Sequence, residues 1–321
     1  MTPANRDMAQ VMLPGLCEVD AELGSLTTYR VGGRVSVAAY PKSVTDLEAI
    51  ARYVAATGCE VLVVGRGSNM LVADSGFDGL AVFTHELPSE MVMPDDADAP
   101  TVAVSANTLL PRLARQCASA GWRGLEWAVG VPGTVGGAVR MNAGGHGSDI
   151  ADALVSVRVF DLVSGSTSVR NADELGLRFR GSALGPLEIV LEAKFRVSAG
   201  SVDDANAQID EIVRWRRENQ PGGQNAGSVF VNPKPHELSA GALIDDLGLR
   251  GRRLGTAEVS TKHANFIQSD MGGKASDVVR LMALVRAEVF DKTGIELRSE
   301  IRLIGFDAEM TRAAGGSVQT L

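Results

Sequence analysis

The most regular stretch of the chain lies near residue 190. From residue 187 to 197 apolar side chains alternate with charged ones, as in Leu191-Glu192-Ala193-Lys194-Phe195. Successive side chains of a strand point to opposite faces, so this alternation predicts a half-buried antiparallel strand over 187–197. Shorter apolar runs predict further strands over residues 35–40, 60–64, 80–84, 101–105, 154–161, 166–170 and 300–305.

Other segments repeat their apolar residues at helical spacing. Such residues recur from Leu47 to Val54, with Ser43 before them as an N-cap and Gly58 after them as the end of the helix. Residues 1–25 and the tail over 307–321 show neither period, and both are expected to be irregular. The helical spacing also predicts helices over about residues 108–120, 202–217 and 240–247, and a long helix capped by Ser276.

Composition narrows the class of protein. The 321 residues are 45% hydrophobic and 22% charged, which is typical of a soluble protein with two or three domains. The net charge of -8 argues against a nucleic-acid groove or an anionic membrane surface as the main partner. No apolar run is long enough for a membrane span, and the N-terminus lacks the pattern of a signal peptide. A cytoplasmic protein is therefore expected.

The cysteines and histidines show no pattern of a metal or disulfide site. Cys17, Cys59 and Cys117 are odd in number and far apart, so they predict buried free thiols in a reducing compartment. No metal is expected, because no ligand spacing links the four histidines. These are His85, His146, His236 and His263.

Three turns of unusual composition are the candidates for chemistry. The first follows the strand over 60–64 and reads Gly65-Arg66-Gly67-Ser68-Asn69-Met70. It is similar to half of a dinucleotide fingerprint, but Met70 stands where the third glycine is needed and no long helix follows, which excludes a Rossmann crossover. Two glycines and a serine after a strand still expose several backbone N–H groups, and this suits a phosphate. An ordinary turn is the alternative.

The second candidate is the glycine-dense stretch from Gly124 to Gly147. Glycine loses more backbone freedom on folding than any other residue, so an ordered segment of this composition needs a reason. Close packing of backbone against a large flat ligand, or against its pyrophosphate, is such a reason. A flexible linker is the alternative, but linkers are polar, and here valine, tryptophan and methionine are interleaved with the glycines. Contact with a ligand is therefore favoured.

The third candidate is the turn Asn225-Ala226-Gly227-Ser228-Val229-Phe230-Val231-Asn232-Pro233. Its glycine and alanine leave the backbone free to approach a ligand, and Ser228 places at its tip a hydroxyl that can give or take a proton. An ordinary surface turn is the alternative.

Arginines occur at two further places of interest. The helix over 202–217 ends in Arg214, Arg216 and Arg217, which either cap the helix dipole or form a phosphate clamp. The segment Leu177-Arg178-Phe179-Arg180-Gly181-Ser182 places two arginines around an aromatic residue, a pattern usual for a solvated strand face.

Taken in order, these segments resemble the UDP-N-acetylenolpyruvoylglucosamine reductase family, flavoenzymes that complete UDP-N-acetylmuramate for peptidoglycan. The resemblance covers roughly residues 25–306. Each stretch alone is weak evidence, whereas the whole set in family order is specific. The matching stretches are Thr28–Gly33, Gly65–Asn69, Gly130–Gly137, Asn142–Gly144, Arg180–Ser182, Ala226–Phe230, His263–Ile267 and Glu300–Arg302.

The resemblance implies an α+β protein. A two-part FAD-binding domain of the vanillyl-alcohol-oxidase (PCMH) type would occupy residues 1–85 and 86–200. A C-terminal α+β substrate-binding domain would follow over 201–306, with a tail over 307–321. No inserted loop with an extra tyrosine is present, so the chain is similar to the shorter form of the family. A monomer is expected.

The resemblance also implies noncovalently bound FAD, with NADPH as the hydride donor. NADPH would reduce the flavin and leave before UDP-N-acetylglucosamine enolpyruvate enters. The hydride would then reach the vinyl methylene carbon, and the adjacent carbon would gain a proton. The residues expected to bind the cofactor are Tyr29, Gly65, Arg66, Gly67, Ser68, Asn69, Met70, Gly130, Val131, Pro132, Gly133, Thr134, Gly136, Gly137, Asn142, Gly144, Gly147 and Val190.

This reaction explains why certain residue types are needed. Hydride addition to an enolpyruvyl ether requires the carboxylate to accept negative charge, and hence cations or donors aimed at it. In the family pattern Arg180 takes this place, Glu300 donates a hydrogen bond if it is held protonated, and Ser228 protonates the carbon as general acid. For Glu300 the alternative is a solvated strand residue. The expected substrate contacts are Arg214, Arg216, Arg217, Asn232 and Arg302.

Two positions depart from the family pattern. Phe179 stands where the family usually has a tyrosine before the active arginine, so any role of that hydroxyl is absent here. Val231 stands where a lysine is common, which leaves open which cation orders the serine or contacts the substrate.

Two other functions compete with the reductase. A sugar or alcohol oxidase of the same flavin fold is the runner-up, but such enzymes often link FAD covalently through a histidine or cysteine of the phosphate loop. The loop Gly65–Asn69 has neither, which favours the reductase. A catalytically silent module that binds a sugar nucleotide or a flavin is the other, and the joint presence of Arg180, Ser228 and Glu300 argues against it.

Overall fold

A computed structural model describes residues 1–94, 98–234 and 237–317. The chain folds into two compact units. Unit 1 comprises Met1–Val19, Val37–Arg66 and Gly79–Glu218, and unit 2 comprises Asp20–Ser36, Gly67–Asp78 and Asn219–Leu321. This division keeps residues 201–218 with unit 1, whereas the functional domains with boundaries after residues 85 and 200 stay a prediction.

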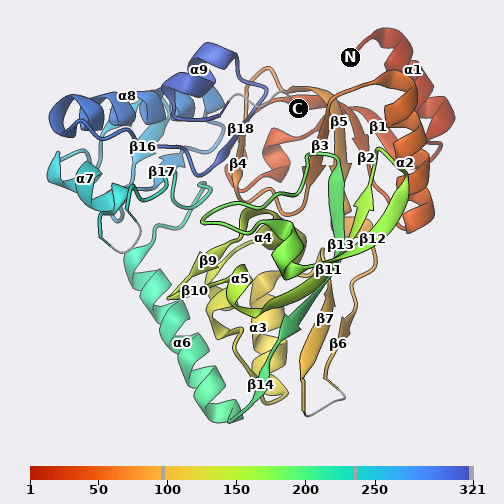
Figure 1. Ribbon diagram of the computed structural model, residues 1–321. Coiled ribbons are helices and arrows are strands. Elements are labelled where there is room, and N and C mark those ends of the chain that lie inside the picture. The colour runs from red at the N-terminus through yellow and green to blue at the C-terminus, as the bar shows by residue number, and fades with distance from the viewer. Residues whose placement is uncertain (95–97, 235–236, 318–321) are drawn as a thin grey trace. The chain divides into compact units, whose positions relative to one another are not determined.

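A five-stranded antiparallel sheet is the centre of unit 1 (Figure 1). The alternation predicted over 187–197 is confirmed, because β13 buries Ile189, Ala193 and Phe195 while Lys194 and Arg196 are exposed. The predicted strands over 101–105, 154–161 and 166–170 are confirmed as well. In order across the sheet the strands are β12 (Ser166–Asn171), β11 (Leu154–Asp161), β13 (Glu188–Arg196), β7 (Thr101–Ser105) and β6 (Met91–Val92).

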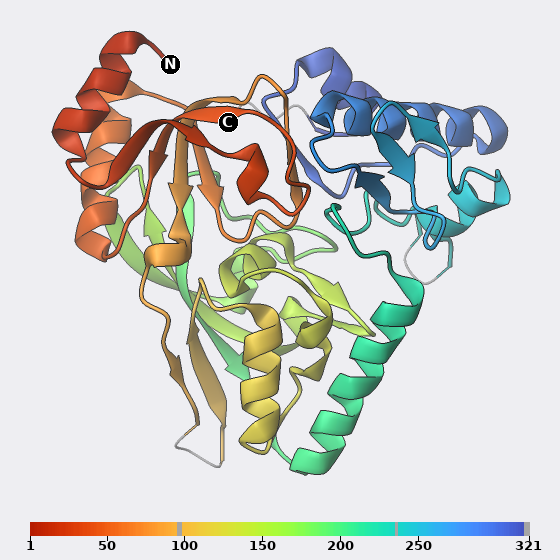
Figure 2. The same ribbon diagram turned by 180° about the vertical axis from the view of Figure 1, so that it is seen from behind.

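Helices of the same unit cover this sheet and form its core. The core joins Val104 and Phe195 of the sheet to Leu113, Trp127 and Ile212 of the surrounding helices. Figure 2 shows α3 and the long helix α6 from behind. The elements are α3 (Leu110–Ser119), β8 (Trp122–Arg123), η3 (Glu126–Gly130), α4 (Val135–Met141), β9 (Gly144–Gly145), β10 (Ser148–Asp149), α5 (Ile150–Ala153), η4 (Ala172–Leu175), β14 (Ser198–Ala199) and α6 (Val202–Asn219).

A second core of unit 1 lies under helices α1 (Pro3–Met12) and α2 (Val44–Thr57). The predicted cap of α2 is confirmed, since the Ser43 hydroxyl accepts from the Asp46 N–H at 3.2 Å. A four-stranded sheet has the order β1 (Cys17–Glu22), β2 (Arg34–Ala39), β5 (Phe77–Phe83) and β3 (Val61–Val64). The short helix η2 (Thr84–Glu86) follows β5.

The expectation that residues 1–25 are irregular is wrong, because they contain α1 and β1. Thr2 caps α1 by accepting from the Asn5 N–H, and Pro3 occupies the first turn, where its missing N–H costs nothing. Helix α1 is largely exposed, and Ala9 is its only buried residue. The Tyr53 hydroxyl of α2 donates to the Asn5 carbonyl at 3.0 Å, which fixes α1 on its neighbour.

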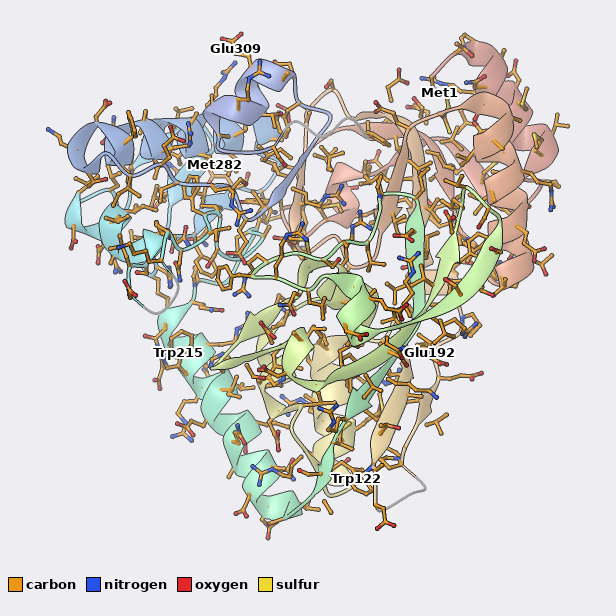
Figure 3. The ribbon with its side chains drawn as sticks, viewed as in Figure 1. Met1, Trp122, Glu192, Trp215, Met282 and Glu309 are labelled. Carbon is orange, nitrogen blue, oxygen red and sulfur yellow. The ribbon has the colours of Figure 1, made fainter. Side chains whose placement is uncertain are left out.

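Unit 2 is built around helix α8 (Ala275–Thr293). Its buried face packs on a three-stranded sheet, and Met282, labelled in Figure 3, lies in this core with Phe230 and Ile301. Strand β4 pairs in parallel with β18, so no helix follows the phosphate loop, as predicted. The other elements are η1 (Gly24–Leu26), β4 (Met70–Val72), α7 (Ala240–Asp246), β15 (Arg253–Leu254), β16 (Ala257–Val259), β17 (Ile267–Ser269), β18 (Arg302–Ile304) and α9 (Ala308–Ala313).

Two predictions about unit 2 are wrong. Ser276 does not cap α8, because the helix begins after Lys274, and the Asp74 carboxylate accepts from the N–H groups of Ala275 and Ser276 at 2.8 and 3.0 Å. The tail is not wholly irregular either, since it contains α9, capped by the Asp307 side chain. Residues 318–321 of the predicted frayed tail lie outside the described residues.

Replacing Asp74 by alanine is expected to destabilise the protein by about 1–2 kcal/mol, because two N–H groups at the start of α8 lose their acceptor. Denaturant unfolding measures the change. The matched control is Ser276→Ala, which removes the residue that the sequence suggests as the cap and is expected to change stability by less than about 0.5 kcal/mol. Equal losses in the two variants would contradict the role of Asp74.

None of the helices in the described part of the chain combines the length and the apolar character needed to cross a membrane.

Candidate active site

Ser228 lies in a turn whose upstream side is held by Asn225. The Asn225 side chain accepts from the Gly227 N–H at 3.0 Å and donates to the carbonyls of Gly222 and Gly223. Gly227 has a φ of 79°, a left-handed conformation that glycine adopts without strain. Ser228 is half-buried, and its hydroxyl makes no hydrogen bond within residues 1–94, 98–234 and 237–317. This hydroxyl is therefore free to bond to a ligand.

The backbone after Ser228 pairs with the segment that carries Glu300. The Glu300 N–H donates to the Val229 carbonyl at 2.9 Å, and the Val231 N–H donates to the Arg298 carbonyl at 2.9 Å. Glu300 is half-buried. Two predicted catalytic residues that are far apart in the sequence thus lie on neighbouring segments of unit 2.

The segment around Glu300 also holds Asn69, which lies in the second half of the loop Gly65–Met70, the predicted phosphate loop. The Asn69 side chain donates to the Glu300 carbonyl at 3.1 Å, and the Arg302 N–H donates to the Asn69 carbonyl at 3.0 Å. Arg302 of β18 is opposite Met70 of β4. The Arg302 guanidinium is half-buried, and burial lowers its pKa. Within unit 2 the structure therefore brings Ser228, Glu300 and Arg302 together with the end of the phosphate loop.

The two residues after Phe230 have different environments. Val231 is 6% exposed, so the position that is commonly a lysine in the family is an apolar core residue here. Arg302 is the predicted substrate-binding cation of unit 2. Asn232 is half-buried and accepts from the Ala240 N–H at 3.1 Å, which uses its carbonyl oxygen at the start of α7.

Tyr29 and Thr28 have different environments in unit 2, and the cofactor contact expected of Tyr29 stays a prediction. Tyr29 is fully buried, its hydroxyl donates to the Ile267 carbonyl at 2.9 Å, and burial raises its pKa, so its side chain belongs to the core. Thr28 donates its N–H to the Gly67 carbonyl at 3.2 Å, while its hydroxyl is buried without a hydrogen-bond partner among the described residues. Sequence reasoning missed Thr28, although it lies in one of the matching motifs, because only burial reveals an unsatisfied hydroxyl.

In unit 1 the start of the phosphate loop touches the glycine-dense stretch. A Cβ added to Gly65 would lie 2.6 Å from Thr134 Oγ1, so only glycine fits. Thr134 caps α4 by accepting from the Gly137 N–H at 3.4 Å. Arg66 is exposed and Ser68 is half-buried. Two segments that were predicted to bind the cofactor are thus in contact.

Several glycines of the dense stretch are explained by packing. The Gly136 N–H donates to the Ala106 carbonyl at 2.8 Å, and a Cβ on Gly136 would lie 3.0 Å from the Ala106 Cβ and 3.6 Å from the Val190 Cβ. The Gly133 carbonyl accepts from the Leu110 N–H at 2.9 Å. These contacts bring α4 close to the sheet. Cofactor roles for Gly133, Gly136 and Val190 stay predictions.

The tip of the β9–β10 hairpin rests on Gly130 and α6. A Cβ on Gly130 would lie 2.7 Å from the His146 ring, which meets the Trp215 ring edge-on at 5.2 Å; Trp215 is labelled on α6 in Figure 3. Burial and the nearby Arg216 lower the pKa of His146. The remaining predicted cofactor residues of the stretch are half-buried Val131 and exposed Pro132, Gly137 and Gly147.

The three arginines at the end of α6 do not share one face. Arg214 and Arg217 are exposed and lie one turn apart, whereas Arg216 is half-buried near His146, and burial lowers the pKa of its guanidinium. Residues two apart on a helix do not face each other. The three arginines therefore do not form a single clamp on one face of α6. Their contacts with the substrate stay predictions.

Arg180 occupies a strained position in a tight turn. Arg178 and Gly181 exchange backbone hydrogen bonds of 2.9 and 3.0 Å, and Arg180 between them has a φ of 57°. This left-handed conformation costs a residue with a Cβ about 1–2 kcal/mol. The guanidinium donates to the Gly144 carbonyl at 3.1 Å and lies 4.8 Å from the centre of the Phe179 ring. Such a conformation persists where the surrounding contacts enforce it.

Asn142 supports the Arg180 turn. Asn142 is 3% exposed, and its side chain donates to the Asp149 carboxylate at 3.1 Å and to the Arg178 carbonyl at 3.2 Å. Its Oδ1 accepts from the Ala151 N–H at 3.0 Å. The side chain of Asn142 therefore joins the glycine-dense stretch to the Arg180 turn, and its predicted contact with the cofactor stays a prediction.

Other predicted positions give mixed results. The cysteines are free thiols, with Cys117 buried and Cys17 and Cys59 half-buried, so only one is buried as expected. Burial, aided by Glu126, raises the pKa of Cys117 to about 12. No cluster of three or more potential metal ligands occurs in the part of the chain that the structure describes, and His236 lies outside that part.

Comparisons with known proteins cover both halves of the chain. Residues 35–169 match the family model described as FAD binding domain. Residues 219–304 match the model described as UDP-N-acetylenolpyruvoylglucosamine reductase, C-terminal domain. The expected α+β class, with an FAD-binding domain followed by a separate C-terminal domain, is confirmed.

Relatives match over most of their length. The chain is 40% identical to the UDP-N-acetylenolpyruvoylglucosamine reductase of Synechococcus sp. strain RCC307, over 92% of this chain and 96% of that protein. It is 39% identical to the reductase of that name from Trichormus variabilis, over 94% and 91%. The crystal structure of the Thermus caldophilus reductase matches with a TM-score of 0.73 and 32% identity, over 90% of this chain and 98% of that one. The chain belongs to the UDP-N-acetylenolpyruvoylglucosamine reductase family.

Proposed function

We propose that the protein reduces UDP-N-acetylglucosamine enolpyruvate to UDP-N-acetylmuramate, a peptidoglycan precursor, with FAD as cofactor and NADPH as hydride donor. The observation that carries this proposal is the pairing of Glu300 N–H with the Val229 carbonyl, because it sets the proposed general acid beside the proposed carboxyl donor. The relatives that bear the reductase name support the same reaction over an oxidase or a silent binding module.

The residues present fit FAD. In unit 1 the Gly65 backbone approaches Thr134 without an intervening side chain, as a close-fitting cradle for a phosphate requires. In unit 2 the buried Thr28 hydroxyl has no acceptor among the described residues and adjoins Gly67. A phosphate oxygen would satisfy it. The Thr28 hydroxyl and the adjoining Gly67 backbone of unit 2 would thus contact a phosphate of the cofactor.

Bound FAD supplies the hydride chemistry between NADPH and the vinyl carbon of the substrate. The chain's own residues govern charge and protons. Arg180 grips the substrate carboxylate and stabilises the negative charge that develops on it. Ser228 gives its hydroxyl proton to the adjacent carbon, for which it needs hydrogen-bond reach. Glu300, in its protonated form, donates a hydrogen bond to the same carboxylate.

The remaining contacts serve the sugar nucleotide. Arg302 is a half-buried cation beside the phosphate loop, and the Asn232 amide nitrogen is left for a ligand when its oxygen caps α7. Arg214 and Arg217 on the exposed face of α6 supply further charge for a diphosphate. A monomeric, cytoplasmic enzyme remains the expectation for assembly and location.

A rapid-mixing experiment tests the reaction. The purified protein is expected to be yellow and to release its flavin on acid precipitation, since the link is noncovalent. NADPH should bleach the flavin under anaerobic conditions, and UDP-N-acetylglucosamine enolpyruvate should then restore its colour with formation of UDP-N-acetylmuramate. Bleaching of the oxidised flavin by a simple sugar or alcohol, return of the colour with O2, and no response to the enolpyruvyl substrate would favour an oxidase.

Replacing Gly65 by alanine is expected to lower the FAD content of the purified protein. The new Cβ would lie 2.6 Å from Thr134 Oγ1, and overpacking of this kind costs about 1–3 kcal/mol. The flavin-to-protein ratio and the shift of the melting temperature on FAD addition measure the effect. Gly145→Ala is the control, because a Cβ there meets nothing within 4 Å. Equal flavin content in both variants would contradict the cofactor role of the Gly65 contact.

A further inference from the structure

We infer that Asn265 is a positioning residue that fixes the Ser228 turn through the backbone of the two residues that follow it. This inference rests on the proposed role of Ser228 as general acid. Asn265 lies in the loop between β16 and β17 and is 3% exposed. It belongs to the matching stretch His263–Ile267, but the resemblance assigns it no contact with substrate or cofactor.

Asn265 makes three hydrogen bonds to residues 229 and 230. Its Oδ1 accepts from the Phe230 N–H at 3.0 Å, and its Nδ2 donates to the Phe230 carbonyl at 2.8 Å. Its own carbonyl accepts from the Val229 N–H at 2.9 Å. Phe230 is fully buried, so its backbone groups have no water to replace these bonds.

The Asn265 amide takes the place of a neighbouring strand. On their other side, residues 229–231 pair with the Glu300 segment, through Glu300 N–H to the Val229 carbonyl and Val231 N–H to the Arg298 carbonyl. The N–H and carbonyl of Phe230 point the opposite way, where Asn265 binds both. Backbone held along both edges cannot rotate, and this sets the direction in which the preceding residue, Ser228, carries its hydroxyl.

Only an amide side chain satisfies both groups of Phe230 at this length. Alanine or leucine satisfies neither, and ionised aspartate can accept from the N–H but cannot donate to the carbonyl. Because a general acid must lie within hydrogen-bond reach of the carbon it protonates, a small displacement of Ser228 is enough to slow the proton transfer. Asn265 therefore acts on the reaction through Ser228 and not by touching the substrate.

A double-mutant cycle on the FAD-loaded enzyme tests the inference. Asn265→Ala is expected to slow flavin reoxidation by UDP-N-acetylglucosamine enolpyruvate about 10–100-fold, the usual result of misplacing a reacting group, while flavin reduction by NADPH is unchanged. In the Ser228→Ala background the same substitution should slow reoxidation by less than about 3-fold, since the group it positions is already absent. Asn265→Asp should fall between the parent and Asn265→Ala.

Met282→Ala is the control that distinguishes a loss of Ser228 positioning in Asn265→Ala from a general loss of stability. Met282 is a fully buried core residue of α8 in the same unit, so its truncation lowers the melting temperature but should leave the reoxidation rate unchanged. If Asn265→Ala does not fold with bound flavin, the double-mutant cycle with Ser228→Ala is measured with Asn265→Asp in its place.

Two results would overturn the inference. One is equal slowing by Asn265→Ala in the presence and absence of the Ser228 hydroxyl, and the other is equal slowing by Met282→Ala. A Ser228→Ala enzyme with the parent reoxidation rate would overturn the proposed role of Ser228 itself, and this inference with it. The Ser228→Ala variant by itself thus distinguishes a failure of the proposed function from a failure of the inference that Asn265 positions Ser228.

Discussion

Replacing Ser228 by alanine is expected to leave flavin reduction by NADPH intact and to slow reoxidation by the enolpyruvyl substrate about 10²–10⁴-fold, the usual contribution of a general acid. The hydroxyl lies at the tip of a turn held by Asn225 and Asn265, and it has no hydrogen-bond partner among the described residues. Its proton is therefore free to be given to the substrate carbon. Rapid-mixing absorbance of the two half-reactions measures both rates.

Ser228→Cys is the matched comparison for this variant. A thiol keeps a transferable proton in nearly the same place, so the cysteine enzyme is expected to reoxidise faster than the alanine enzyme and slower than the parent. If the alanine enzyme reoxidised at the parent rate, Ser228 would have no part in the proton transfer.

Replacing Arg180 by lysine is expected to reduce the rate of the oxidative half-reaction about 10²–10³-fold, comparable to the loss of one donor that stabilises developing charge. Lysine keeps the charge but loses the planar fork that binds a carboxylate through two parallel bonds. It also cannot stack on Phe179 or reach the Gly144 carbonyl in the same geometry. Single-turnover kinetics at saturating substrate measure the loss.

Arg178→Lys is the control for Arg180, because it changes an exposed arginine of the same turn. Its half-reactions are expected to match those of the parent. If Arg180→Lys and Arg178→Lys behaved alike, the substrate carboxylate would have to be bound by another cation, and Arg302 of unit 2 would be the first to test.

Secondary structure is predicted correctly where its cause lies in neighbouring residues, and incorrectly where its cause is a residue remote in the sequence. The strands over 101–105 and 154–161 and the helix over 44–57 are recognised because each buries one face, and this imposes a period on consecutive residues. The start of α8 differs from the start at Ser276 that the sequence predicts, because the acceptor for its first N–H groups is Asp74, which is remote in the sequence. No local pattern can reveal such a partner.

The candidate site divides in the same way. Motifs in family order suggest Ser228, Arg180 and Glu300 as reacting groups, because the reaction demands those residue types, and these roles stay predictions. The motifs could not reveal which other residues hold these three side chains in place. Asn142 and Asn265 both lie in stretches that match the family, but the contacts by which they support the Arg180 and Ser228 turns are visible only from burial and from partners remote along the chain.

By itself, then, the amino-acid sequence determined the family and most of the regular elements of this protein, because both leave a pattern in neighbouring residues. The reacting groups that the sequence suggests stay predictions. Tertiary structure alone decided that Tyr29 is a core residue, that Thr28 has an unsatisfied hydroxyl, and that a buried amide holds the Ser228 turn. A hydrogen bond has to be satisfied within about 3 Å in space, whereas its two partners can be any distance apart along the chain.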